Sequence, residues 1–332
     1  MKNGRYLQIL FLIIICTLSA CSSLPKGCPE KCAGAIMVNK RLDGHNLSNG
    51  VFVDADLRNA QLKQTNLSSS DLSGANLTDA NLQEANLNGA NLIGINATNA
   101  SFLKADMRGT NVRGANFTGA VLTNAILESI EFDGAILNKA ELIGADLQGI
   151  DLRSLQLQNA NLSNANLSGS NLDGVSASGV NLNGAMLIEA TLRGAKLNIA
   201  NLTGADLRGA NLSGASLNGA NLNGVILTNA NLRGVSFIGA NLNGADLRGA
   251  DLQGAFLTLA EMEQLGIPIY NLCNSDAFVN TPMFQDEVLA ELSSSQCTEL
   301  LLHEPDFEGV RYNDQTMWPT EFEPPLSAIN QN

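Results

Sequence analysis

Residues 200–224 read ANLTG, ADLRG, ANLSG, ASLNG and ANLNG, which are five consecutive variants of one five-residue unit. In the same register a large apolar residue, or in two places Ala, occupies every fifth position from Met37 to Met262 without a phase slip. This gives 46 units between Ala35 and Gln264, whose centres are 35 Leu, five Phe, three Met, two Ala and one Val. A period this strict indicates a repeat architecture, in which chain length sets the height of a stack rather than a number of globular domains.

A period of five residues matches neither the 3.6-residue period of an α-helix nor the two-residue alternation of a strand, so we expect one turn in every unit. Ala205 and Leu207 are two positions apart and therefore share one face of an extended segment. Asp206, Arg208 and Gly209 are polar or small and suit an outer face and a turn. Repetition of this unit predicts a coil with a dry, Leu-filled centre, whose stacked turns pair their backbones about 4.8 Å apart.

The phrase Ala-(Asn/Asp)-Leu-x-Gly resembles the repeat of the pentapeptide-repeat proteins, and it covers about 70% of the chain. The resemblance implies an all-β solenoid of a particular kind, a right-handed quadrilateral β-helix with four units per coil. The 46 units would then form about 11 coils, a rod of roughly 55 Å at the spacing of paired strands.

Four units per coil would place residues 20 positions apart one above the other, and one outward column agrees with this spacing. The column alternates in sign through Arg113, Asp133, Arg153, Asp173 and Arg193. Each Arg would then lie one coil from an Asp. We interpret the column as a charge ladder of surface ion pairs, worth a few tenths of a kcal/mol each, rather than as a binding site.

Core volumes follow the same spacing. Ala97 and Ala177 are the two small centres, and they lie 80 positions, or four coils, apart. The inward residues that precede them, Ile95 and Val175, are larger than the usual Ala, and Phe117 would stack on Ala97. Volume lost at one inward position is thus restored nearby, as a close-packed interior requires.

The outer surface offers two candidate binding features. One column carries Asn at 161, 181, 201, 221 and 241, and we favour a local role, in which each Asn bonds to its own turn, over a ligand-binding ladder. Apolar residues interrupt the polar exterior at Val121, Ile126, Ile136, Met186, Ile226 and Phe256. Scattered surface apolar residues are normal, and a partner-binding patch is the alternative.

The first 20 residues have the layout of a bacterial export signal. Lys2 and Arg5 precede an apolar run over 7–20, which is too short to cross a bilayer comfortably. The run ends in LSAC at 18–21, which resembles a bacterial lipobox, and the resemblance implies that Cys21 becomes the lipid-modified first residue. The resemblance also implies that sorting to the outer membrane is permitted, because the residue after Cys21 is Ser22 and not Asp. Cleavage as an ordinary signal peptide and retention as an uncleaved anchor are the alternatives.

Export also bears on the remaining cysteines. Cys16 would leave with the leader and Cys21 would carry lipid, which leaves Cys28, Cys32, Cys273 and Cys297. An even number outside the cytoplasm predicts disulfides, and pairing by locality joins the first two and the last two. A metal site at the first pair is the alternative, but two thiols without a neighbouring His make a poor one.

Charge and periodicity both change at the end of the repeats. The net charge of −13 divides into +3 for 1–34, −6 for 35–264 and −10 for 265–332, so most of the acidity is a solubilising tail. An open end of the β-helix needs a cover. A helix start at Thr281-Pro282, followed by apolar residues on one helical face, predicts a partly helical C-terminal cap. The segment 309–319 resembles the closing segment of many pentapeptide-repeat proteins from photosynthetic bacteria.

These features predict four parts. They are a lipoprotein signal peptide over 1–20, a lipidated tether and N-terminal cap over 21–34, the β-helix over 35–264, and the C-terminal cap with its acidic tail over 265–332.

The sequence contains no pattern that predicts catalysis. His45 and His303 lie near opposite ends of the rod, and no Gly-rich phosphate loop, nucleophile elbow or metal-spaced His/Cys set occurs. The nearest acidic group, Glu128, Glu131 and Asp133, lacks the aromatic platform of glycan-cleaving β-helices. We therefore expect no enzyme activity, no cofactor and no metal.

The leading hypothesis is a non-catalytic, membrane-tethered scaffold or protein-interaction module in the bacterial envelope. It would be an exported monomer, held by its lipid on the outer side of the cytoplasmic membrane or in the outer membrane, with a protein partner and no nucleic-acid partner. A first alternative is a DNA-mimicking protein that binds DNA gyrase or topoisomerase, because some pentapeptide-repeat proteins bind gyrase that way. The leader and the only mildly acidic body argue against it. A second alternative is an adhesin or envelope-stabilising protein.

Overall fold

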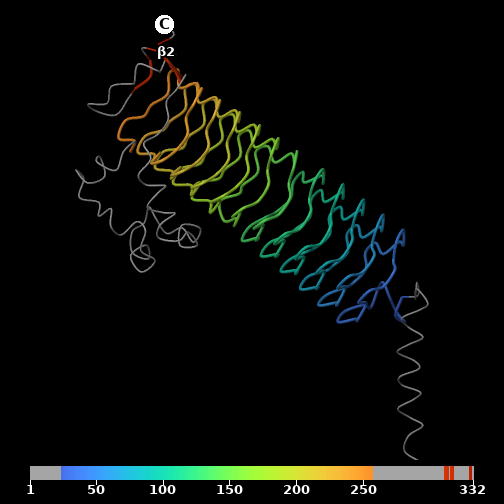
Figure 1. Cartoon of the computed structure of the whole chain (residues 1–332). Coiled ribbons are helices and arrows are strands. Elements are labelled where there is room, and N and C mark those ends of the chain that lie inside the picture. The colour runs from blue at the N-terminus through green and yellow to red at the C-terminus, as the bar shows by residue number, and fades with distance from the viewer. Residues whose placement is uncertain (1–23, 257–309, 314, 318–328, 331–332) are drawn as a thin grey trace, which may run out of the picture.

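The protein is an elongated stack of similar coils, as the computed structural model in Figure 1 shows. The structure describes residues 24–256, 310–313, 315–317 and 329–330. Parallel β-bridges join residue i to residue i+20 at every fifth position but two, from Ile36 paired with Asp56 to Ser236 paired with Phe256. One coil is therefore four units long, which confirms the four-sided coil. We number the sides from the first to the fourth by their first centres, which are Met37, Leu42, Leu47 and Phe52.

Each unit is a short bridge followed by a turn. The amide of Leu207 donates to the carbonyl of Ile226 in the next coil at 2.7 Å, while its own carbonyl accepts from the amide of Ala210 at 3.0 Å and closes the turn. Gly209 within this turn has a φ of +65°, a conformation that Gly adopts without steric cost. Gly at the end of the unit therefore favours the corner of the coil, and Asn takes the same conformation in other units, as Asn229 does with a φ of +59°.

The centres of the units fill the interior. Every centre from Met37 to Leu252 is at most 2% exposed, which confirms the predicted Leu stack. Ala97 and Phe117 lie in neighbouring coils, and the ring of Phe117 packs edge-on against that of Phe102 with centroids 5.5 Å apart. The small centre and the large one thus offset each other, as close packing requires.

The N-terminal end of the stack begins one unit before the predicted start of the β-helix. Cys32 is fully buried and takes the centre position five residues before Met37. Its amide donates to the carbonyl of Val51 at 2.9 Å, and the amide of Val51 donates to the carbonyl of Pro29 at 2.8 Å. Residues 29–34 therefore cover the fourth side of the first coil.

The other end of the described stack is covered by a segment from near the C-terminus. Strand β1 (Arg311–Tyr312) pairs in parallel with β2 (Ile329–Asn330), and Arg311 also bridges Asp246 in the stack. Met317 bridges Asp251 on the next side. Arg311 and Met317 are six positions apart, whereas their partners Asp246 and Asp251 are five apart, so the cover uses one residue more than a repeat unit does. The predicted cap helix near 281–292 and units 257–264 lie outside the described residues, so the helix and the coil count stay predictions.

Candidate functional site

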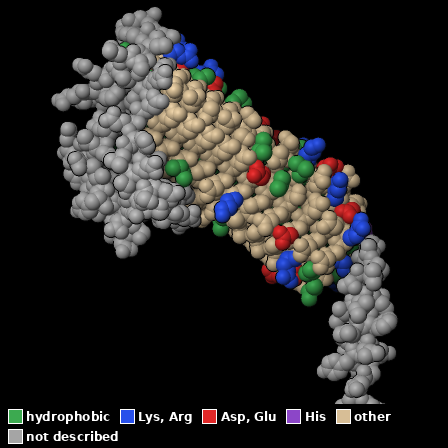
Figure 2. Space-filling model, in the orientation of Figure 1, with side chains coloured by type: hydrophobic (Ala, Val, Ile, Leu, Met, Phe, Trp, Pro, Cys, Tyr) green, Lys and Arg blue, Asp and Glu red, His purple; other side chains and the backbone are tan. Residues whose placement is uncertain are grey.

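On the face that Figure 2 shows, charged and apolar side chains are scattered singly among backbone and uncharged side chains. The predicted local role of the Asn column is confirmed, because Asn201 Oδ1 accepts from the amide of Thr203 at 3.2 Å within the same unit. The column is also a ladder: Asn201 Nδ2 donates to Asn181 Oδ1 at 3.2 Å, and Asn181 Nδ2 donates to Asn161 Oδ1 at 3.0 Å. These amides are used within the fold.

Charged side chains pair mainly within one unit, which sequence analysis missed. In the ADLRG type of unit the Arg lies two positions after the Asp and reaches it directly, as Arg208 reaches Asp206 at 2.7 Å. The same pairing joins Arg108 to Asp106 at 2.6 Å, and this hydrogen bond holds the pKa of Asp106 below its ordinary value. The Asp-x-Arg spacing is the signal that could have predicted it.

The predicted charge ladder is present only in part. Arg113 lies 3.5 Å from Asp133, and Arg193 lies 2.5 Å from Asp173, each pair spanning one coil. Arg153 was expected to join these pairs into one column. It turns instead to Asp151 in its own unit, with Nη2 2.6 Å from Oδ2, and this hydrogen bond lowers the pKa of Asp151. The ladder is therefore interrupted at Arg153, because the partner two positions away is within direct reach.

The other predicted residues do not form a binding site. Cys28 and Cys32 are joined in a disulfide with Cα atoms 5.1 Å apart, whereas Cys21, Cys273 and Cys297 lie outside the described residues. Among the six apolar positions, Ile126 and Met186 are exposed by 45% and 43%. These two residues lie three coils apart. The other four positions are half-buried: Val121, Ile136, Ile226 and Phe256. No continuous apolar patch therefore connects these six residues.

The strongest irregularity of the described stack is a gap in the backbone ladder. From the pair of Ile36 and Asp56 to the pair of Ser236 and Phe256, only two pairs at the bridging position lack a bridge: Ile126 with Asp146 and Glu131 with Asp151. The two positions are consecutive and lie on the third and fourth sides. On the other two sides the same coils stay joined, through Val121 with Glu141 and Ile136 with Gln156. We call residues 124–134 and 143–154 the seam.

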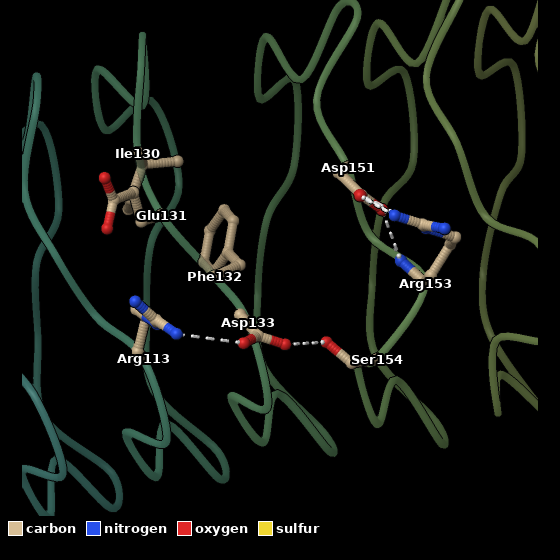
Figure 3. Close-up of a pocket in the computed structure, with 8 residues that line it drawn as sticks. All are labelled: Arg113, Ile130, Glu131, Phe132, Asp133, Asp151, Arg153 and Ser154. Carbon is tan, nitrogen blue, oxygen red and sulfur yellow. Dashed lines mark hydrogen bonds and ion pairs between the residues drawn. The ribbon is translucent and has the colours of Figure 1, made fainter.

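A charged cleft of about 680 Å³ opens in the seam on the fourth side (Figure 3). Asp133 lies between Arg113 on one side and Ser154 on the other, and Ser154 Oγ donates to Asp133 Oδ1 at 3.0 Å. The same hydroxyl accepts from the amide of Gly134 at 2.9 Å, where intact coils use a backbone carbonyl. The Ser154 side chain thus takes the place of the backbone carbonyl that would accept from Gly134 in an intact coil.

The turn at Ser154 is distorted in a second way. From Asn39 to Gly254, the residue at this position of every unit has a positive φ, with Ser154 as the single exception. A second cleft of about 750 Å³ lies on the third side, lined by 124–129 and by residues between Gly144 and Ile150. The seam is therefore open across two adjacent sides and the corner between them.

No group of three or more His, Cys, Asp or Glu residues in the described part of the chain is arranged to hold a metal ion. Nor do the described residues include a helix with the length and hydropathy needed to span a bilayer.

The family model for pentapeptide repeats matches residues 35–74, 75–114, 115–153, 156–194, 187–224 and 226–264. The chain belongs to the pentapeptide-repeat family. The described stack is accordingly a right-handed quadrilateral β-helix. Pentapeptide-repeat proteins are generally non-catalytic structural or interaction proteins.

The chain is similar to three solved structures in particular. HetL, a pentapeptide-repeat protein involved in heterocyst differentiation regulation in the cyanobacterium Nostoc, is 31% identical over 65% of this chain and 89% of its own, with a TM-score of 0.34. Rfr23 from the cyanobacterium Cyanothece is 40% identical over 26% of this chain and 58% of its own, with a TM-score of 0.26. Full-length QnrB1, a plasmid-mediated fluoroquinolone resistance protein, is 23% identical over 70% of this chain and 99% of its own, with a TM-score of 0.21. A comparison with curated proteins found no match.

Proposed function

We propose that this pentapeptide-repeat protein is a non-catalytic scaffold or protein-interaction module of the bacterial envelope, tethered to a membrane through lipid on Cys21. The observation that supports an interaction role is the filled interior, because every described centre is at most 2% exposed. A close-packed core leaves the outer surface as the place where a partner can be met.

The outer surface suits a scaffold because its positions are fixed by the backbone. The turn of each unit is closed by its own hydrogen bond, as between Leu207 and Ala210, and each coil is bonded to the next. Side chains in one column therefore repeat at the strand spacing of about 4.8 Å. A partner would meet side chains held at set intervals, which reduces the ordering needed on binding.

The proposed tether rests on the N-terminal sequence. Lys2 and Arg5, the apolar run over 7–20 and the LSAC sequence at 18–21 support export followed by lipidation of Cys21. A single acyl chain binds membranes weakly, so stable anchoring needs more than one chain.

Labelling with radioactive palmitate in a bacterial host tests the tether. We expect the full chain to incorporate label and to sediment with membranes, and Cys21→Ala to lose both properties. Cys28→Ser with Cys32→Ser is the matched control and should keep the label. Absence of label, with the protein in the cytosol, would overturn the tether and favour the gyrase-binding alternative, which inhibition of DNA supercoiling by the purified chain would then test.

The interaction role has its own measurement. The lipidated chain is crosslinked in intact cells, recovered from solubilised membranes and compared with an unrelated lipoprotein of similar abundance. A partner recovered in stoichiometric amount with this chain alone is the expected result. If solubilised membranes return the chain alone, as a monomer, the interaction role is rejected.

A further inference from the structure

The seam carries an inference that deepens the proposed function and rests on it. In an intact coil the amide of each centre donates to a carbonyl 19 positions later, as Leu122 donates to Glu141 at 2.7 Å. In the described seam the amides of Leu127 and Phe132 make no such bond, and the amides of Asp146 and Asp151 make none to the preceding coil. Two facing rows of backbone donors and acceptors are therefore unpaired on the outside of the rod, which is the arrangement that accepts an added strand.

The side chains of the seam explain why it is open. Ile130 and Ile150 lie one coil apart at an inward position, so the core at this level must hold two large β-branched residues together. Glu131 and Asp151 would occupy adjacent bridging positions, and like charges directly opposite each other destabilise strand pairing. Large side chains in the core and like charges on the surface thus both push these two coils apart.

The charge of the seam selects the kind of partner. Its residues include five carboxylates and one Arg, a net charge of −4, compared with −6 for the whole of 35–264. Asp133 and Asp151 are paired with Arg side chains, whereas Glu128, Glu131 and Asp146 belong to none of the ion pairs among the described residues. Ile126, exposed by 45%, supplies an apolar contact on the third side.

We propose that the seam binds an extended, positively charged segment of a protein partner. The segment would hydrogen-bond to the unpaired backbone groups and place Lys or Arg side chains against Glu128, Glu131 and Asp146. About five residues would cover one side and about ten would follow the seam around the corner, because the repeat itself advances one side in five residues. The repulsion between Glu131 and Asp151 would be relieved by the bound cations.

Binding of labelled peptides to the purified full chain tests the proposal. The probe is a fluorescein-labelled decapeptide that alternates Lys with Val, compared with the same peptide carrying Glu for Lys and with a Lys peptide interrupted by Pro. We expect fluorescence anisotropy to show binding of the alternating Lys peptide alone, because Glu repels the seam and Pro removes the backbone donors. Hydrogen exchange at Leu127, Phe132 and Asp151 should slow when it binds.

Matched substitutions separate the seam from general acidity. Glu131→Gln with Asp146→Asn should weaken binding of the Lys peptide by about tenfold. The control is Glu141→Gln with Asp71→Asn, because Glu141 accepts from an Asn at 2.8 Å as Glu131 does at 2.7 Å, and Asp71 accepts from an Asn at 3.0 Å as Asp146 does at 3.1 Å. Both control residues lie on an intact ladder, so their removal should leave binding unchanged.

Three results would overturn the proposal. They are binding of no peptide, equal binding of the Pro-interrupted peptide, and equal weakening by the seam and control substitutions. The proposed function is judged separately, because a partner that is crosslinked in cells equally by the wild type and by the seam variant supports an interaction module and rejects the seam as its site.

Discussion

Ile130 and Ile150 lie 20 positions apart in one inward column of the fourth side, and they are its two largest described members. The other members are Gly50, Ser70, Ala90, Thr110, Ser170, Ala190, Ala210, Ala230 and Ala250. Ile130 is 6% exposed, and Ile150 is half-buried but packs on the same core. The coils separate at the level of these two residues, and overpacking of this kind typically costs about 1–3 kcal/mol.

We therefore predict that Ile130→Ala with Ile150→Ala closes the seam. Hydrogen exchange at the amides of Phe132 and Asp151 should slow, because the ladder bonds absent from the seam can form. Urea unfolding should show a smaller loss of stability than two buried apolar deletions usually cause, since relief of overpacking offsets the lost burial.

Ile95→Ala is the control for the Ile substitutions. Ile95 is also a large inward residue, 1% exposed, but its coil is fully bridged to both neighbours. The Ile95→Ala variant should lose about 2–5 kcal/mol of unfolding free energy, and hydrogen exchange should slow at none of its amides. Faster exchange at Phe132 in the double variant would contradict overpacking as the cause of the seam.

The hydroxyl of Ser154 should matter more than its exposed position suggests. It joins Asp133 and Gly134 across the seam, so Ser154→Ala should cost about 0.5–1.5 kcal/mol of unfolding free energy and speed exchange at Gly134. Ser163→Ala is the matched control, because no described hydrogen bond involves the Ser163 side chain, and it should change neither quantity. If the two substitutions had equal effects, the Ser154 hydroxyl would not be what joins the two coils at this point.

The Leu stack sets the stability of the rod. Leu192 is fully buried, so Leu192→Ala should lower the free energy of unfolding by about 2–5 kcal/mol in urea titrations followed by circular dichroism. Ile93→Ala removes an outward side chain that is 42% exposed and should change stability by about 0.5 kcal/mol or less. Comparable losses from both would contradict the assignment of inner and outer positions.

Acid should weaken the pair formed by Asp173 and Arg193. Burial alone would raise the pKa of Asp173, but hydrogen bonds from the side chain and amide of Arg193 outweigh it and hold the pKa below its ordinary value of 3.8. A lowered pKa contributes stability that is present above 3.8 and is lost as the pH falls through the lower, folded-state pKa. Urea midpoints measured between pH 7 and pH 2 should therefore differ between wild type and Asp173→Asn at neutral pH and converge in acid. Ile93→Ala removes no ionisable group and leaves this pair intact, so its urea midpoints should follow those of the wild type throughout.

The sequence predicts the regular part of this fold well because one unit determines its own geometry. Leu207 and Gly209 specify an inward centre and a corner wherever they recur. Four units per coil came from the family resemblance, the charge column agreed with it, and the bridges between residues 20 positions apart confirm it. The seam was not predicted, although Ile130 and Ile150 were visible in the sequence, because each of them is an acceptable inward residue by itself. Only their position one coil apart makes them too large together, and that effect depends on packing between coils rather than on the unit.

Val310 is the residue on which the cover at the C-terminal end of the described stack should depend. It is fully buried and precedes Arg311, whose carbonyl accepts from the amide of Leu247 at 2.8 Å. Val310→Asp would bury an unpaired charge, so we expect residues 310–317 to detach and hydrogen exchange at Leu247 to accelerate. Met317→Ala is the control, because Met317 is 43% exposed and is held on the stack by two backbone hydrogen bonds, beside one long contact of 3.8 Å from Gln253 Nε2 to its sulfur. The uncovered coil would present unpaired strand groups, so light scattering should detect association of Val310→Asp at high concentration and none of the control. If exchange at Leu247 stays slow in Val310→Asp, the cover is held by other contacts.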